Sequence, residues 1–228
     1  MFQHNDPQYE GHDLLEIRDY FQQIIVFELD QNSIVYEATA SQLFGYLFSL
    51  NSENLFLQYT PEVLSIFTKV FISKSDSIYY HNLAKSLISV HWKDSFLEVY
   101  RCIESVFHTI EYIEIYNQSR LEVSLKEFSK MIETSIGHKP SEEQSLITIF
   151  KNVNTLPIEL IQKIKPASYL QAKDATWFYS IRNSIVHSRP AVDEVSFDTP
   201  TWNILLLASL HIVEQCHEMY GLQEFVSA

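Results

Sequence analysis

Apolar residues recur every three or four positions along most of this chain, which is the spacing of one face of an α-helix. The clearest stretch covers residues 94–117, where charged side chains occupy the opposite face. Its apolar stripe consists of Phe96, Val99, Tyr100, Ile103, Val106, Phe107, Ile110 and Ile113. We therefore expect one long helix over this stretch.

Start and stop signals predict further helices. Gly137 ends the pattern of residues 121–136, and Ser141-Glu142-Glu143-Gln144 has the form of a capping box that opens a helix reaching residue 150. Similar patterns predict helices at 43–50, 61–71, 158–164, 169–188 and 201–220, with a loop at 189–198. With only 4 glycines in 228 residues, these patterns predict a mainly α fold class.

The first 78 residues permit two interpretations. Apolar positions between residues 14 and 24 suit a helix, whereas 24–29 and 33–36 flank Asp30-Gln31-Asn32 as the strands of a β-hairpin would. Residues 1–70 carry 10 acidic and 2 basic side chains. We expect an acidic accessory region over 1–78 and a helical domain over 79–228.

Composition narrows the class of protein. A hydrophobic share of 46% excludes a disordered chain, and the formal net charge of −13 excludes a surface that attracts nucleic acid as a whole. The polar start of the chain and the lack of a long apolar run predict a cytoplasmic protein that does not enter membranes. Cys102 and Cys216 lie among apolar residues without CxxC spacing, so we expect buried free thiols.

One stretch departs from this acidic character. Residues 151–190 carry six basic side chains against two acidic ones, a net charge of +4. A basic patch of this kind can bind the phosphates of a nucleic acid, although an ordinary solvated helix face gives the same pattern.

The basic stretch contains the sequence Arg182-Asn183-x-x-x-His187. On a helix Asn183 and His187 share a face, and Arg182 lies roughly 140° around the axis from His187. A guanidinium offers paired donors to a phosphate and stays charged. An imidazole that titrates near neutral pH can take a proton from a hydroxyl and return one to a leaving oxygen.

This motif resembles the signature of the HEPN superfamily, which is an Arg, a polar residue, three to five further residues and a His. The surrounding helix order looks similar over residues 80–220, including an aromatic-Arg-x-x-Glu element at Tyr100, Arg101 and Glu104. The resemblance implies a HEPN-like antiparallel helical bundle that forms a homodimer with two motifs facing each other. Many members look like metal-independent endoribonucleases of toxin–antitoxin and antiviral defence systems.

The resemblance also implies a role for each residue. His187 would act as general base or acid at a ribose 2′-hydroxyl, Arg182 would stabilise charge on the scissile phosphate, and Asn183 would orient either group. The product would be a 2′,3′-cyclic phosphate, so RNA and not DNA would be cut. Arg101 and Glu104 would support the site, although an exposed pair three residues apart on a helix gives the same pattern. Candidates for contacts with the RNA backbone are Lys163, Lys165, Lys173 and Arg189.

Some features favour other interpretations. HEPN toxins that are modified on a Tyr two residues after the His differ from this chain, which has Arg189 there. A His at a helix end can simply bind the last carbonyl groups. The chain would then be a non-catalytic binding module that holds a partner protein, or an antitoxin-like regulatory subunit. We expect no cofactor and no metal, because the six-residue spacing of His211 and His217 is poor for two helical ligands.

Overall fold

The computed structural model divides into two compact units, Met1–Tyr36 and Glu37–Ala228. The residues that it describes are 20, 28–33, 36, 38–73, 75, 77–119, 122–123, 125–137, 141–187 and 195–219. In the first unit the backbone N–H of Ser33 donates to the carbonyl of Asp30 at 2.9 Å, which forms a tight turn. The flanking segments expected to be helix or hairpin lie largely outside the described residues.

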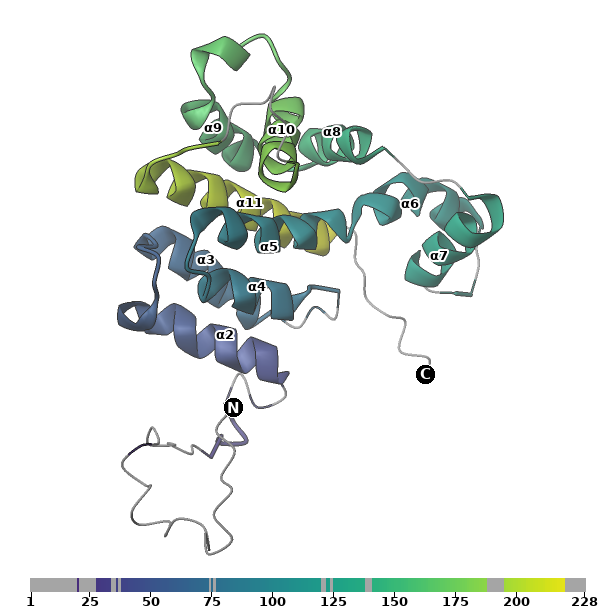
Figure 1. The fold of residues 1–228 in the computed structure, drawn as a ribbon. Helices are drawn as coiled ribbons and strands as arrows, with labels where there is room; N and C mark the ends of the chain where they lie inside the picture. Colours follow the sequence, from purple (N-terminus) through teal and green to yellow (C-terminus); the bar gives the residue numbers. More distant parts are fainter. Residues whose placement is uncertain are drawn as a thin grey trace, which may run out of the picture. The chain divides into compact units, whose positions relative to one another are not determined.

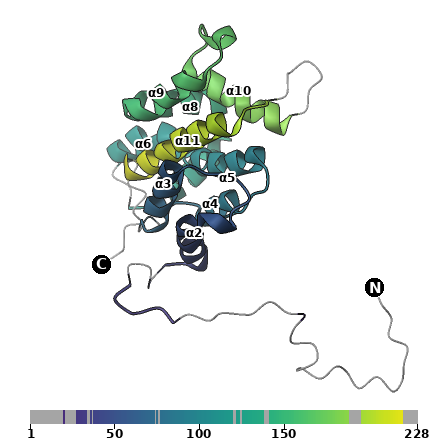
Figure 2. The same cartoon turned by 90° about the vertical axis from the view of Figure 1, so that its left-hand side faces the viewer.

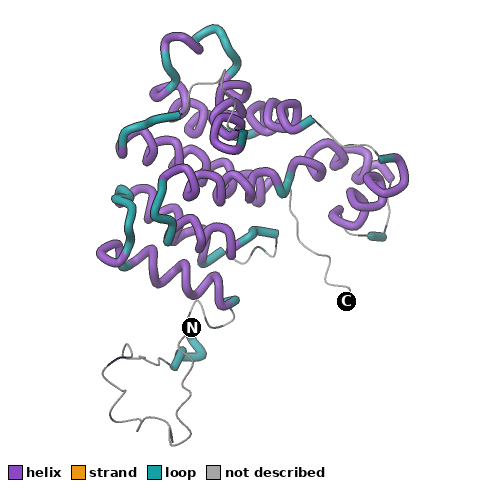
Figure 3. The backbone as a smooth tube through the Cα atoms, in the orientation of Figure 1, coloured by secondary structure: helices purple, strands orange, loops and turns teal. Residues whose placement is uncertain are grey.

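The second unit consists mainly of helices joined by loops, and its described residues contain no strand (Figure 3). Its helices are α2 (Ala40–Leu50), α3 (Pro61–Phe71), α4 (Tyr80–Leu87), α5 (Trp92–Glu104), α6 (Phe107–Ser119), α7 (Leu125–Ile136), α8 (Glu142–Asn152), α9 (Thr155–Ile164), α10 (Asp174–Val186) and α11 (Thr199–Met219), with short 3₁₀ turns η2 (Ser52–Asn54) and η3 (Ala167–Tyr169). The prediction of a mainly α fold is confirmed. Within the described residues, no helix combines the length and the apolar character that a membrane crossing requires.

Local signals explain several helix ends. Thr60 accepts from the backbone of Val63 and Pro61 occupies the first turn, so α3 begins where the sequence predicts. Gly137 adopts φ 68° after α7, a conformation that glycine takes without steric cost. At α8 the start is as expected, but the side chain of Ser141 makes no capping hydrogen bond, so the predicted capping box does not form.

The helix expected over residues 94–117 is two helices. The chain turns at Ser105 and Val106, between α5 and α6, where the Ser105 hydroxyl donates to the carbonyl of Cys102 at 2.7 Å. Val106 is fully buried at the turn, so the apolar stripe continues across the break and hides it from a periodicity analysis. The sequence analysis also did not place α4.

Helix α11 lies at the centre of this unit and packs against α3, α5 and α9 (Figures 1 and 2). Leu205, Leu206, Leu210 and Val213 on α11 are fully buried, which explains its apolar sequence. Helices α6 and α7 form a side hairpin with a smaller apolar cluster of their own, and α6 also contacts α8 (Figure 1). The main core therefore depends on a helix from the end of the chain.

Helices α2 and α3 belong to the same packed unit as the helices that follow them. Helix α2 packs on α3 and α4, and α3 packs on α11. Gly45 on α2 faces the buried ring of Phe71 so closely that a Cβ would lie 2.1 Å from it. Asn203 on α11 accepts from the backbone N–H of Thr60 at 2.7 Å and donates to the carbonyl of Gln58 at 3.0 Å. The boundary between compact units thus falls after Tyr36, whereas the sequence led us to expect it after residue 78.

Candidate active site at the end of α10

Helix α10 carries Arg182 and Asn183 in its last turns. Trp177, Phe178 and Ile181 are almost fully buried and hold one face of α10 in the core. Arg182 follows Ile181 directly, so its side chain leaves the helix at the edge of this buried face, where α10 meets α5 and α8. The apolar anchors thereby determine which neighbours the guanidinium can reach.

Two carboxylates and an amide surround the Arg182 guanidinium. Its Nη2 donates to Oε1 of Glu104 on α5 at 2.9 Å, and its Nη1 donates to Oδ1 of Asn183 at 3.1 Å. Nη1 also lies 3.6 Å from Oε2 of Glu142, the first residue of α8. The Tyr100 ring packs against the same group, with its centre 5.9 Å from the guanidinium carbon. Arg182 therefore joins three helices while its side chain stays 17% exposed.

The local charges keep Arg182 protonated. Burial disfavours the charged form, but the carboxylates of Glu104 and Glu142 outweigh this effect and raise the pKa of Arg182. Burial raises the pKa of Glu104 above its usual value, although Arg182 acts in the opposite direction. The pKa of Tyr100 is also raised, chiefly because its phenol is buried. Tyr100 consequently remains a neutral group beneath a permanent cation.

His187 does not share a helical face with Asn183 as the sequence analysis assumed. Helix α10 ends at Val186, and His187 is the C-cap residue with φ −114° and ψ 96°, outside the helical region. Its backbone N–H donates to the carbonyl of Asn183 at 2.9 Å, which closes the last turn. The imidazole is exposed and makes no hydrogen bond or ion pair to any side chain described here. Arg182 and Asn183 thus touch each other, and His187 stands one residue past the helix end.

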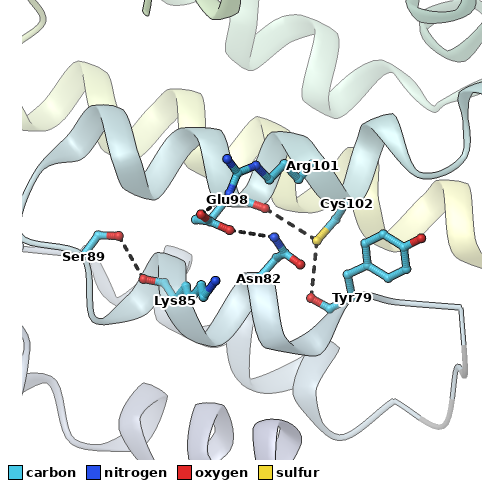
Figure 4. A network of polar contacts seen from close by, with 7 residues as sticks. All are labelled: Tyr79, Asn82, Lys85, Ser89, Glu98, Arg101 and Cys102. Atoms are coloured by element: carbon cyan, nitrogen blue, oxygen red, sulfur yellow. Dashed lines mark hydrogen bonds and ion pairs between the residues drawn. The ribbon is translucent and has the colours of Figure 1, made fainter. Parts of the chain in front are cut away.

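Arg101 and Glu104, the two residues predicted to support the site, have different partners. Glu104 binds Arg182, as described above. Arg101 instead forms an ion pair with Glu98 of its own helix, and Glu98 accepts from the amide of Asn82 on α4 at 2.6 Å (Figure 4). Figure 4 shows Glu98 pointing toward Asn82 on α4, with Arg101 beside Glu98 along α5. Arg101 therefore belongs to the junction of α4 and α5, whereas Glu104 belongs to the Arg182 cluster.

The lysines expected to bind RNA also differ in their surroundings. Lys165 is buried, with 5% of its side chain exposed, and its ammonium binds the carbonyl of Ala172 and Oδ1 of Asp174, the latter at 2.8 Å. This ammonium stabilises the loop between α9 and α10 and does not point to solvent. Lys163 and Lys173 are exposed. Arg189 lies outside the described residues.

Sequence reasoning missed Glu142 as a member of this cluster. The sequence pattern assigned Glu142 to the start of a helix, and this assignment suggested no further contact. Its contact with Arg182 joins residues 40 positions apart, which a local pattern does not show. Tyr100 was assigned to the core, and it is 1% exposed, but its ring also faces the guanidinium.

Both cysteines and His217 are buried. Cys102 and Cys216 are buried free thiols, as predicted, and burial raises the pKa of Cys216 to about 12. His217 is also buried, and its Nδ1 lies 2.7 Å from the Ser77 hydroxyl oxygen. Within the described ranges, no group of three His, Cys, Asp or Glu residues is arranged to hold a metal ion.

Comparison of the chain with protein-family models, with curated proteins and with solved structures finds no match. The family resemblance therefore depends on the motif residues Arg182, Asn183 and His187 and on the order of the helices around them.

Proposed function

We propose that this chain is a metal-independent endoribonuclease of the HEPN type. The observation that carries the proposal is the end of α10, where a permanently charged Arg182 bound to Asn183 lies one turn before the exposed His187. A cation for a phosphate and a free imidazole for a proton are the two groups that cleavage by a 2′-hydroxyl requires.

In the proposed reaction His187 takes the proton of a ribose 2′-hydroxyl, and the oxygen attacks the adjacent phosphorus. Arg182 stabilises the additional negative charge on the phosphate oxygens. The imidazolium of His187 returns the proton to the leaving 5′-oxygen, and the other product keeps a 2′,3′-cyclic phosphate. Asn183 holds Nη1 of the guanidinium through its amide oxygen, so its role is to position Arg182.

We further propose that the active form is a homodimer with two α10 ends at its interface. The exposure of Val186, at 46%, and of His187 supports this, because each leaves a surface at the end of the helix that a second copy can cover. In this proposal the protein acts in antiviral defence or as the toxin of a toxin–antitoxin pair, restrained by its acidic N-terminal region or by a companion protein.

Cleavage of tRNA and total RNA in the presence of EDTA tests the catalytic proposal directly. Substituting His187→Ala should lower the rate by about a hundredfold or more, because the proton acceptor is lost. The matched control is His91→Ala, which removes another exposed histidine, at the start of α5. Absence of cleavage by the unaltered protein, or equal rates for His187→Ala and His91→Ala, would reject the assignment.

A second candidate function is a non-catalytic module that holds a partner protein. The ion pairs of Arg182 with Glu104 and Glu142 favour it, because they give this arginine a structural role without any RNA. Induced expression separates the two candidates. Growth arrest that His187→Ala abolishes supports the nuclease, whereas expression without any effect on growth supports the binding module or a regulatory subunit.

A further inference from the structure

The two carboxylates at Arg182 hold it in different ways. Glu104 accepts a hydrogen bond from Nη2 at 2.9 Å and comes from the last turn of α5. Glu142 lies 3.6 Å from Nη1, beyond hydrogen-bond distance, and its side chain is 41% exposed against 29% for Glu104. Oε2 of Glu142, the oxygen nearest Nη1, is shielded from solvent and has no hydrogen-bond partner within the described part of the chain. Glu142 is therefore the outer and more weakly bound of the two anions.

This cluster as it stands does not suit a phosphate. One guanidinium faces two carboxylates, so the cluster carries a net negative charge when both are ionised, and it repels an incoming polyanion. Glu104 and Asn183 already occupy one position each on the guanidinium fork. Of the N–H groups that remain for a phosphate oxygen, the second one on Nη1 lies beside Glu142.

Glu142 also has a second favourable position. As the first residue of α8, it lies at the positive end of a helix dipole with unsatisfied backbone N–H groups nearby. A rotation of its side chain away from Arg182 would keep the carboxylate in this field. Exchanging Glu142 for a phosphate then costs less than removing a fully buried ion-pair partner.

We propose that Glu142 occupies the phosphate-binding edge of Arg182 in the free protein and that RNA binds by displacing it, while Glu104 keeps the guanidinium in place. This inference rests on the proposed ribonuclease function and assigns that site its regulation. Glu142 is then a built-in competitor of the substrate, and any event that removes its charge or turns it away activates the site. Glu104 is a positioning residue.

The neighbouring residue supplies a matched control. Glu143 lies in the same turn of α8 and carries the same charge, but its Oε1 accepts from the Thr176 hydroxyl at 2.8 Å. Glu143→Gln and Glu142→Gln therefore change the long-range electrostatics alike, and only Glu142→Gln frees Arg182. The probe is a short single-stranded 2′-O-methyl RNA, which has no 2′-hydroxyl to react, and its binding is measured by fluorescence anisotropy at one salt concentration.

We expect Glu142→Gln to bind this RNA about tenfold more tightly than Glu143→Gln or the unaltered protein, the size of one charge-assisted contact. Glu142→Ala should show the same gain, which covers the case in which the glutamine variant does not fold. In an Arg182→Ala background the gain should vanish, because the competition is for Arg182.

Equal affinities of Glu142→Gln and Glu143→Gln would overturn the inference, as would a gain that persists without Arg182. The ribonuclease proposal is judged separately, by cleavage of ordinary RNA. If the protein cleaves RNA and the two variants bind alike, the nuclease stands and the competitor role of Glu142 falls. If Glu142→Gln gains affinity and no variant cleaves, Glu142 competes at a binding site that is not catalytic.

Discussion

At the residue scale, two histidines show how burial decides what the same side chain can do. His187 is exposed at the end of α10, where its imidazole is accessible to solvent. His217 is 5% exposed on α11, and burial lowers its pKa to about 4. The sequence pattern does not distinguish the two histidines, because both lie near the end of a predicted helix. The contact of His217 with Ser77, which is 140 positions away, appears only in the fold.

The lowered pKa of His217 predicts a loss of stability in acid. Unfolded chains bind a proton at this residue below pH about 6.5, whereas the folded protein binds it only near pH 4. Its contribution is therefore fully present above pH 6.5 and is lost as the pH falls toward 4, by about 3 kcal/mol in total. Urea unfolding of the unaltered protein at pH 7 and pH 4.5 measures this loss.

The variant His217→Gln should reduce the difference between the two pH values, because an amide can replace the contact with Ser77 and does not titrate. The control His81→Gln removes an exposed histidine on α4 and should leave the difference unchanged. If both variants respond to pH alike, His217 is not the group responsible.

At the element scale, the sequence predicted the presence of most helices correctly but placed some of their ends wrongly. Phe96, Val99 and Ile103 are buried as the apolar stripe predicted. The turn at Ser105 was missed because it contains no glycine or proline and does not interrupt the stripe. The sequence analysis placed His187 inside a helix, whereas α10 ends at Val186. A helical pattern does not show which residue is the last of the helix.

The α9–α10 connection shows the same limit for charged residues. Lys163 and Lys165 look equivalent in the sequence, but only Lys165 is buried against Asp174, which also accepts from Gln162 at 2.9 Å. We expect Lys165→Ala to lower the free energy of unfolding by about 2 kcal/mol, because it leaves a partly buried carboxylate without its cation.

The matched variant Lys163→Ala should change the free energy of unfolding by less than about 0.5 kcal/mol, as is usual for an exposed side chain. Urea unfolding at neutral pH compares the two variants. Similar stabilities would contradict the buried position of the Lys165 ammonium.

At the scale of the whole molecule, contacts between distant residues set the domain boundary. Tyr59 donates to the carbonyl of Ser86 on α4 at 2.7 Å, and Thr60 donates to Asn203 on α11. The acidic character of residues 1–70 and the ambiguous pattern of the first 78 residues suggested a boundary after residue 78, but neither feature shows which helices pack together. The Arg182 cluster was predictable only in part. The sequence motif contains Arg182 and Asn183, whereas Glu142 reaches them only through the packing of α8 against α10.

Two truncated chains test this boundary. Residues 37–228 keep every helix from α2 to α11, so we expect a helical circular dichroism spectrum and cooperative thermal unfolding. Residues 79–228 lack α2 and α3, whose removal exposes the partners of the fully buried Phe67 and Phe71. It also removes two partners of the buried Asn203, the carbonyl of Gln58 and the N–H of Thr60.

We expect the shorter chain to unfold without a cooperative transition or to aggregate. A stable and cooperative 79–228 chain would show instead that α2 and α3 form an accessory layer.

The central place of α11 has a consequence for protein synthesis. Translation must pass residue 219 before the helix that fills the core is complete, and until that helix has left the ribosome, α3, α5 and α9 have no common partner. A nascent or prematurely terminated chain carries the whole Arg182 motif on a bundle that has not closed. Helix α5, which supplies Glu104 to the Arg182 cluster, gains its contacts with α11 only when this last helix docks.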